Sequence, residues 1–189
     1  MIEGDRLPTL AGGRVRLRWL EEDDVDDLLR IFGNAEVMRY WSSPPLADRA
    51  AAVSLLAEIR ELFARHTLYQ WGVTLPDDGP VIGTCTLTSF HAESGRSEIG
   101  FALGREHWGR GYMSDALAAL LDYAFGPLDL RRLEADVDPR NGPSLRLLER
   151  VGFRREGLLR ERWITNGEVQ DSLFFGLLRR ECRPGRRRR

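Results

Sequence analysis

Hydrophobic residues along this chain fall into two kinds of pattern, one with helical spacing and one alternating with polar residues. The clearest helical pattern is Met113, Leu117, Leu120, Leu121 and Ala124, at positions i, i+4, i+7, i+8 and i+11. Strict alternation, as in the segment RVRLRWL near the N-terminus, predicts a half-buried strand. The predicted helices are residues 25–32, 47–66, 113–124 and 144–151, and the predicted strands are residues 14–20, 68–75, 81–90, 98–103, 133–137, 154–164 and 169–178.

The order of these elements, β-α-α-β-β-β-α-β-α-β-β, predicts one mixed α/β sheet. Turn residues at 76–80 and 91–97 predict an antiparallel meander for the three strands that they separate. Asn166-Gly167 predicts a closing hairpin, and Gly152 suits the position that ends the last helix. Residues 14–20 are expected to form an edge strand.

Charge is distributed unevenly along the chain. The chain has 189 residues and a formal net charge of −1, and this length favours a single domain. Five arginines lie after residue 182, whereas all 29 acidic residues lie before it, so the body is mildly acidic and suits a cationic partner better than nucleic acid. We expect one domain over residues 1–182 and a disordered basic tail over residues 183–189. Contact of this tail with RNA or the ribosome is the alternative.

Several chemistries are disfavoured by what the sequence lacks. No apolar run reaches the roughly 18–20 residues of a membrane span, and the N-terminus has no signal-peptide pattern. Cys85 and Cys182 give no disulfide framework and no metal spacing, so a reducing cytoplasm and no bound metal are expected. Cys85 lies in an apolar alternation and is predicted to be a core residue. Lysine is absent, which excludes Walker A, Schiff-base and kinase-type lysines.

A loop with three glycines joins the strand 98–103 to the helix that follows it. Gly104, Gly109 and Gly111 let the backbone approach an anion, and the free N–H groups at the start of the helix attract it. This arrangement predicts a phosphate-binding loop, although a lone Gly-x-Gly also fits an ordinary turn.

Three segments, in this order, carry a resemblance to a known family. They are Trp108-Gly109-Arg110-Gly111-Tyr112-Met113, Asn141-x-x-Ser144, and residues 147–153. With the element order they resemble the GNAT superfamily of N-acetyltransferases over roughly residues 10–182. Within it the chain is most similar to the RimJ/RimL branch, which acetylates ribosomal-protein N-termini and includes many relatives of unknown substrate. The segments that support this branch are residues 36–40, 98–101, 171 and 173–181.

The resemblance implies acetyl-CoA as cosubstrate and a mostly antiparallel sheet of about seven strands with about four helices, splayed between the fourth and fifth strands. It implies that the amides of residues 109–114 face the pyrophosphate, with added contacts from Arg105 and Arg110. The pantetheine arm is expected to pair with the strand 98–103. Glu106 stands where the family has Gln or Arg and is expected to point away from the phosphates. The implied cofactor-binding residues are Phe101, Ala102, Leu103, Trp108, Gly109, Arg110, Gly111, Tyr112, Met113, Ser114, Asn141 and Ser144.

Two residues are candidates for catalysis. Ser144 either caps or starts the helix 144–151 or, by the resemblance, gives a proton to the leaving thiolate or binds its sulfur. Glu98 lies beside the expected thioester and can act as a base, the alternative being an exposed strand glutamate. His107 is expected on the loop surface. Holding a side-chain amine of pKa about 10.4 half neutral at pH 7 costs about 4.6 kcal/mol, whereas an α-amine near about 7.8 needs about 1 kcal/mol.

These observations predict direct acetyl transfer to a primary amine in a ternary complex, with a protein or peptide N-terminal amine as acceptor. The enzyme is expected in the cytoplasm as a monomer or homodimer. A small amine such as a polyamine, amino acid or aminoglycoside is an alternative acceptor. The acidic stretch at residues 21–27 would then attract the amine, rather than only favour the start of a helix. A non-catalytic acyl-CoA-binding or ribosome-associated module is the other alternative.

Overall fold

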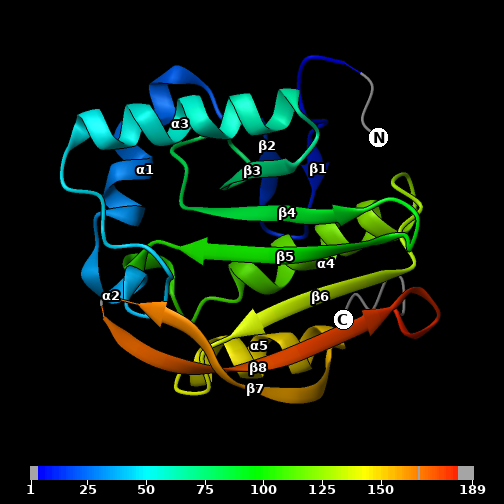
Figure 1. Cartoon of the computed structure of the whole chain (residues 1–189). Helices are drawn as coiled ribbons and strands as arrows, with labels where there is room; N and C mark the ends of the chain where they lie inside the picture. The colour runs from blue at the N-terminus through cyan, green and yellow to red at the C-terminus, as the bar shows by residue number, and fades with distance from the viewer. Residues whose placement is uncertain (1–3, 166, 183–189) are drawn as a thin grey trace.

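A computed structural model of the chain describes residues 4–165 and 167–182 (Figure 1). The basic tail and Asn166 of the predicted turn therefore lie outside the described residues. No described helix has both the length and the apolar character needed to cross a bilayer. The helices are α1 (Val25–Phe32), α2 (Ala35–Met38), α3 (Arg49–Ala64), α4 (Tyr112–Phe125) and α5 (Gly142–Val151), with short 3-10 turns at Glu22–Asp24, Arg105–His107 and Arg179–Glu181. The strands are β1 (Leu10–Ala11), β2 (Arg16–Arg18), β3 (Leu68–Thr74), β4 (Gly83–His91), β5 (Arg96–Leu103), β6 (Arg132–Val137), β7 (Arg154–Thr165) and β8 (Glu168–Leu178).

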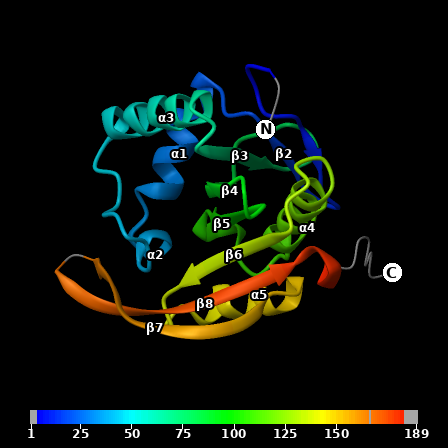
Figure 2. The ribbon, with the colours of Figure 1, turned by 45° about the vertical axis from the view of Figure 1, so that its right-hand side comes forward.

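The eight described strands form one sheet in the order β1-β2-β3-β4-β5-β6-β8-β7. Every neighbouring pair is antiparallel except β5 and β6, which run parallel. The mixed α/β fold and the β3–β4–β5 meander are therefore confirmed. In two views the far end of the β7–β8 hairpin reaches toward α2, although α2 lies far away in sequence (Figures 1 and 2).

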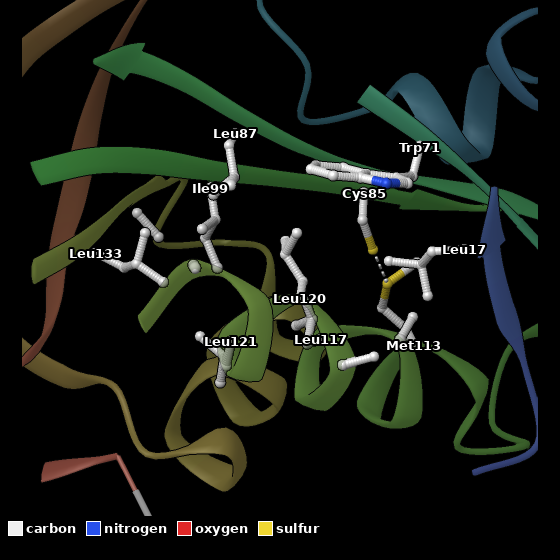
Figure 3. Packing of buried hydrophobic residues seen from close by; sticks show 14 of the residues in the cluster. Leu17, Trp71, Cys85, Leu87, Ile99, Met113, Leu117, Leu120, Leu121 and Leu133 are labelled. Carbon is white, nitrogen blue, oxygen red and sulfur yellow. Dashed lines mark hydrogen bonds between the residues drawn. The ribbon is translucent and has the colours of Figure 1, made fainter. Parts of the chain in front are cut away.

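Helices cover both faces of the sheet, with α1 and α3 on one face and α4 and α5 on the other (Figure 2). The apolar stripe predicted for α4 is confirmed, because Met113, Leu117, Leu120 and Leu121 are all buried in one hydrophobic core (Figure 3). Cys85 is fully buried, as predicted, with its Sγ 3.5 Å from the Sδ of Met113. Burial raises the pKa of the Cys85 thiol, so this residue is a core residue and not an activated nucleophile.

The described residues contain one strand and one helix more than the sequence predicts. β1 pairs with the outer side of β2, so the prediction that residues 14–20 form an edge strand is wrong. A strand of two residues is too short to show an alternating pattern. The short helix α2 forms because the side chain of Asn34 accepts the N–H groups of Glu36 and Val37 at 2.9 and 3.2 Å.

β5 and β6 diverge after a short paired segment, and this divergence shapes the site. Three residue pairs join the strands, the last being Glu98 opposite Glu134, and no pair of described residues follows. Arg96 of β5 bridges the closed end to Glu134 at 2.6 Å, and Arg132 of β6 contacts the other oxygen of Glu134 at 2.7 Å. The predicted splay is therefore confirmed, and ion pairs hold the point at which it begins.

Arg132 extends this network to β7 by donating to both carboxylate oxygens of Glu156, at 2.9 and 2.6 Å. The pair crosses β8 at Gly176, where a Cβ atom would lie 2.6 Å from the guanidinium nitrogens of Arg132. A side chain at this position would displace the ends of Arg132 and Glu156, so glycine leaves room for their ion pair. The hydrogen bonds from Arg132 lower the pKa of Glu156 and outweigh its burial.

Candidate active site

Beyond Glu98, the edge of β5 that faces β6 is unpaired with any described strand. The N–H of Gly104 donates to the carbonyl of Ile82 at 2.8 Å, so the even-numbered residues of β5 direct their backbone groups toward β4. Because these groups alternate along a strand, the N–H and C=O groups of Phe101 and Leu103 point into the opening. Such an edge can pair with an extended, peptide-like molecule.

The glycine loop leads into α4, whose first turn leaves backbone N–H groups free. Gly109 and Gly111 have φ values of +74° and +79°, which glycine adopts readily. Gly111 precedes α4 directly, and the N–H groups of residues 111–114 have no partner within the helix. An anion at this end of the helix would meet these groups and the positive end of the helix dipole. The loop therefore fits a pyrophosphate.

Arg14 braces this loop, a role that the sequence pattern did not reveal. Its Nε donates to the Oδ2 of Asp115 at 2.7 Å, and its Nη1 donates to the carbonyl of Arg110 at 2.8 Å. The hydrogen bond and the charge of Asp115 raise the pKa of Arg14. In the sequence, Arg14 is only one of several alternating arginines, and nothing distinguishes it from Arg16.

Trp108 ties the loop back to the end of β5. Its indole Nε1 donates to the carbonyl of Leu103 at 2.6 Å, so one backbone group of the open edge is already hydrogen-bonded. Arg105 lies over the Trp108 ring at 4.8 Å from its centroid and pairs with Glu36 of α2 at 2.8 Å. These contacts position the 3-10 turn before the glycines.

Glu106 and His107 lie on the same turn and differ from each other in what they contact. The Glu106 carboxylate lies 3.3 Å from the Nε of Arg30 on α1. This ion pair directs the carboxylate to a cation outside the glycine loop. The prediction that His107 is a loop-surface residue holds only in part, because its side chain is 19% exposed and its Nδ1 is buried without a partner among the described residues. Burial lowers the pKa of His107; Glu106 opposes this effect, and Arg110 and Arg30 reinforce it. The imidazole is therefore neutral at neutral pH.

A cavity of about 310 Å³ lies where β5 and β6 diverge. Its walls come from these two strands, the start of α5, the segment after α2 and the β7–β8 hairpin. Four of the predicted site residues line it together: Glu98, Phe101, Asn141 and Ser144. The other predicted residues, Ala102, Leu103 and residues 108–114, do not line it, and the side chain of Ala102 is buried in the core of the α1–α3 face. The structure thus separates a cavity lined by reactive groups from the anion-binding loop, with β5 joining them.

The start of α5 presents Asn141 and Ser144 to the cavity. Asn141 is the residue that caps the helix, because its Oδ1 accepts the N–H of Ser144 at 3.3 Å. Ser144 therefore does not cap this helix, but it lies in the first turn, close to the predicted start at residue 144. The Ser144 hydroxyl has no hydrogen-bond partner among the described residues and can act on a bound molecule.

Four carboxylates line the cavity, and three of them are held by donors. Asp136 accepts hydrogen bonds from Ser172, Trp163 and Arg162. Asp138 accepts from Arg140, and Asp171 accepts from the backbone N–H of Glu161. Burial acts to raise the pKa of Asp138, but the hydrogen bonds from Arg140 outweigh it, so this pKa lies below its ordinary value. Glu98 has no such partner within the described part of the chain. Its carboxylate oxygens are therefore the ones that remain free to contact a bound amine.

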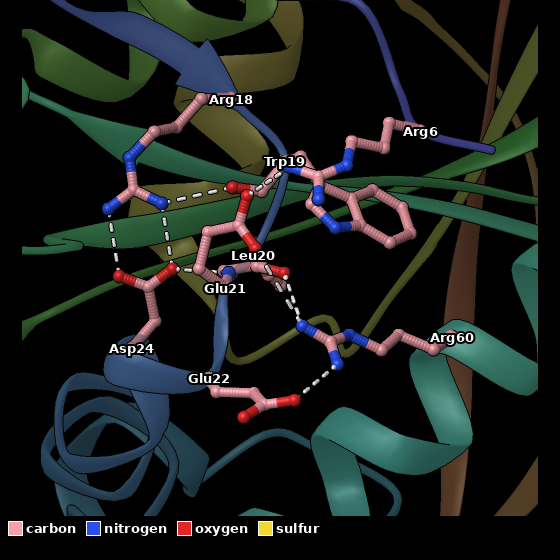
Figure 4. Close-up of polar contacts among 8 residues, drawn as sticks. All are labelled: Arg6, Arg18, Trp19, Leu20, Glu21, Glu22, Asp24 and Arg60. Carbon is pink, nitrogen blue, oxygen red and sulfur yellow. Dashed lines mark hydrogen bonds and ion pairs between the residues drawn. The ribbon is translucent and has the colours of Figure 1, made fainter. Parts of the chain in front are cut away.

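The acidic stretch before α1 does not line this cavity. Arg18 contacts both carboxylate oxygens of Asp24 at 2.7 and 2.8 Å, and the N–H of Glu21 donates to Asp24 at 2.8 Å (Figure 4). Arg60 of α3 contacts Glu22 at 3.3 Å. These contacts favour the interpretation of the stretch as the start of a helix. A larger hollow of about 850 Å³ adjoins it, but that hollow contains no residue of the glycine loop or of the open β5 edge.

Several residues of the cavity were not found by sequence reasoning, and others were noticed only as parts of a motif. Asp136 and Trp163 carry no local signal in the sequence, because their proximity depends on how β6 and the hairpin pack. Tyr40 and Asp171 belong to segments that resembled the RimJ/RimL branch, but the resemblance gave neither a role.

An open strand edge, a loop at its end that fits an anion, and a cavity with a free carboxylate form an arrangement that suits acyl transfer. The family described as Acetyltransferase (GNAT) domain matches residues 14–154. The chain belongs to the GNAT family and is an acetyl-CoA-dependent N-acetyltransferase.

Similar proteins and solved structures support this family assignment. The chain is 38% identical to an uncharacterised N-acetyltransferase, p20, of Bacillus licheniformis, over 93% of this chain and 98% of p20. It is 27% identical to spermidine N(1)-acetyltransferase of Escherichia coli K12, over 84% of this chain and 83% of that protein. Mycobacterium smegmatis RimJ, solved in complex with CoA-disulfide, is similar with a TM-score of 0.83 and 26% identity, over 90% of this chain and 87% of RimJ. The likeness to RimJ is consistent with the RimJ/RimL-like branch.

Proposed function

We propose that this enzyme transfers the acetyl group of acetyl-CoA directly to the N-terminal amine of a protein or peptide, in a ternary complex. The observation that carries the proposal is that Glu98 of β5 and Ser144 of α5 line one cavity beside the open strand edge. Trp163 in the cavity wall is 43% exposed, so the cavity opens to solvent, as a polypeptide acceptor requires. An α-amine also needs only about 1 kcal/mol to become half neutral at pH 7. The similarity to RimJ supports this acceptor class.

Each part of the site has a role in this proposal. Acetyl-CoA supplies the thioester whose acetyl group is transferred. The backbone of β5 at Phe101 and the amide of Asn141 bind the cosubstrate arm, and the free N–H groups of residues 109–114 bind its pyrophosphate, with Arg110 adding positive charge. The amine nitrogen bonds to the acetyl carbon as the bond from that carbon to sulfur breaks. Glu98 accepts the proton of the amine, and the Ser144 hydroxyl gives a proton to the leaving sulfur. Water then restores the proton of Ser144 and takes up the proton of Glu98.

A small cationic amine is the second candidate acceptor, and a specific feature of the cavity favours it. Four aromatic residues, Tyr40, Trp41, Phe101 and Trp163, line the cavity together with its carboxylates. Aromatic faces and carboxylates both attract ammonium groups. The similarity to a spermidine acetyltransferase supports this candidate.

We further propose that the acetyltransferase domain spans residues 1–182 and works in the cytoplasm. Support for a reducing compartment comes from Cys85 and Cys182, which are both free thiols.

The test is an acceptor screen with acetyl-CoA, read by thiol release. Peptides with a free N-terminus are compared with N-acetylated peptides that carry a lysine, and with spermidine. We expect turnover of the free N-terminal peptides. Ser144→Ala and Glu98→Gln are each expected to lower kcat by about 100-fold, because each removes a proton-transfer group. The matched control is Glu93→Gln, which removes an exposed carboxylate outside the cavity and should leave kcat unchanged.

The outcomes separate the candidates. Turnover of spermidine without turnover of peptides would replace the first acceptor class by the second. If none of the amines in the panel causes thiol release, both acceptor classes are excluded. Unchanged turnover in both variants would show that Glu98 and Ser144 are not catalytic and that the site works by positioning and water.

A further inference from the structure

Trp163 of β7 is fixed in the wall of the cavity by a residue from another strand. Its indole Nε1 donates to the Oδ1 of Asp136 on β6 at 3.1 Å. Arg162 lies over one face of the ring, with its guanidinium carbon 5.2 Å from the ring centroid. Because the single polar group of the indole is already bonded to Asp136, the part of Trp163 that remains for an acceptor is the carbon surface of its other face.

A bulge in β7 brings Trp163 to this position. Leu159 pairs with Ser172 and Trp163 pairs with Gln170, so three residues of β7 lie opposite one residue of β8. That one residue is Asp171, whose Oδ1 accepts the backbone N–H of Glu161 at 2.8 Å. Bulges re-aim the side chains that follow them and occur beside active sites. The extra residues of this bulge set the direction of Trp163 relative to the cavity.

Glu161 shows that the bulge is under constraint. Its φ is +53°, a left-handed conformation that is costly for a residue with a side chain. The hydrogen bond from its N–H to Asp171 helps to hold this conformation, and Asp171 itself lines the cavity. The wall of the cavity is therefore built from backbone and side-chain contacts that converge on one aromatic residue.

Asp136 serves as the anchor on the β6 side. Besides Trp163, it accepts from the hydroxyl of Ser172 on β8 and lies 3.4 Å from the Nε of Arg162. It lies on the part of β6 that has already diverged from β5, so the indole is joined to the strand opposite Glu98. The direction of Trp163 is thus coupled to the splay of the sheet.

We propose that Trp163 is the residue that selects the acceptor, by packing its indole carbons against the carbon chain next to the reacting amine. This inference rests on the proposed acetylation of amines and adds the feature that the enzyme reads. An indole without a free donor favours aliphatic carbon and cationic nitrogen and gives no reward to hydroxyl or amide groups. The preferred acceptor therefore carries an aliphatic group directly beside its amine.

The experiment measures kcat/KM for matched pairs of probes: tetrapeptides beginning with Leu or Gly, and butylamine or methylamine. We expect the wild-type enzyme to prefer the longer carbon chain in each pair. Trp163→Ala is expected to reduce that preference by about tenfold, while the KM for acetyl-CoA changes by less than about twofold. Trp163→Phe keeps a ring without the donor, so it should retain most of the preference. The matched control is Ile164→Ala, the neighbouring exposed apolar residue outside the cavity.

A merely structural role would raise the KM for acetyl-CoA and for all acceptors together, and would not change the ratio within a pair. An unchanged ratio in Trp163→Ala, with wild-type turnover of at least one probe, would overturn this inference and leave the acetylation of amines standing. No turnover of any probe by the wild-type enzyme would overturn both.

Discussion

Gly109 and Gly111 share a left-handed backbone conformation but differ in their surroundings. A Cβ atom on Gly109 would have no neighbour within 4 Å. A Cβ atom on Gly111 would lie 2.5 Å from the Nη2 of Arg14, the residue that braces the loop. Replacing each glycine by alanine therefore distinguishes two costs. Both positions share the cost of a left-handed backbone conformation, and only Gly111 adds the cost of displacing Arg14.

Gly111→Ala is expected to be more damaging than Gly109→Ala. Gly109→Ala should lower the free energy of unfolding by about 1–2 kcal/mol, the cost of a left-handed alanine. Gly111→Ala should lower it further, because it also displaces Arg14 from Asp115 and from the carbonyl of Arg110. Urea unfolding measures the first effect, and the KM for acetyl-CoA measures the disturbance of the loop.

The comparison between the two variants carries its own control, since both replace a loop glycine with the same residue. Equal losses of stability would mean that the contact with Arg14 adds nothing. A larger KM effect for Gly109→Ala would mean that the bracing by Arg14 is not what orders the loop.

At the scale of the elements, the closed end of the β5–β6 splay depends on charge. The Arg132–Glu156 pair crosses β8 at Gly176, and hydrogen bonds from Arg132 hold the pKa of Glu156 below its ordinary value of 4.5. A carboxylate whose pKa is lowered in the folded protein stabilises it above the unfolded value. This stabilisation is lost as the pH falls through the lowered folded-state value.

Glu156→Gln is therefore expected to destabilise the protein at pH 7 and to have less effect at low pH. The difference in unfolding free energy between wild type and variant should be constant above pH 4.5 and shrink steadily below it. Urea unfolding from pH 7 to about pH 3 measures this difference. Glu149→Gln, on an exposed carboxylate of α5, should give a difference that stays small throughout. A difference independent of pH would show that the ion pair does not account for the effect of Glu156.

Long and strongly patterned elements could be predicted from the sequence, whereas short ones could not. The helix α4 follows its apolar spacing, and the β3–β4–β5 meander follows its turns. β1 has two residues and α2 has four. Each spans only about one period of its pattern, so no repeat of hydrophobic positions is present in the sequence. The position of β8 between β6 and β7 depends on tertiary packing, which no local pattern encodes.

At the scale of the whole molecule, the site combines parts that sequence motifs specify with parts that only the fold brings together. The motifs identified Glu98, Asn141 and Ser144, and the cavity contains all three. They did not identify the contact between Trp163 and Asp136, which are 27 residues apart and lie on different strands. The pattern of charges also suggested that the acidic stretch at residues 21–27 attracts the amine. In the structure Asp24 of this stretch contacts Arg18 and the N–H of Glu21, and the stretch does not line the cavity.

The unpaired edge of β5 has a consequence for the exchange of amide hydrogens with solvent. Amides that form no backbone hydrogen bond exchange quickly, and a ligand that bonds to them protects them. The amides of Phe101 and Leu103 point into the opening, whereas those of Ala102 and Gly104 face β4. Free protein should therefore show fast and slow exchange at alternate residues along one strand.

Addition of acetyl-CoA should slow exchange at Phe101 and Leu103 and leave Ala102 and Gly104 unchanged, as measured residue by residue by NMR. Uniform slowing along the strand would indicate general stiffening and not pairing with the cosubstrate. Slowed exchange at alternate residues of β5 would therefore locate the bound cosubstrate along the open strand edge. This measurement needs neither turnover nor knowledge of the acceptor.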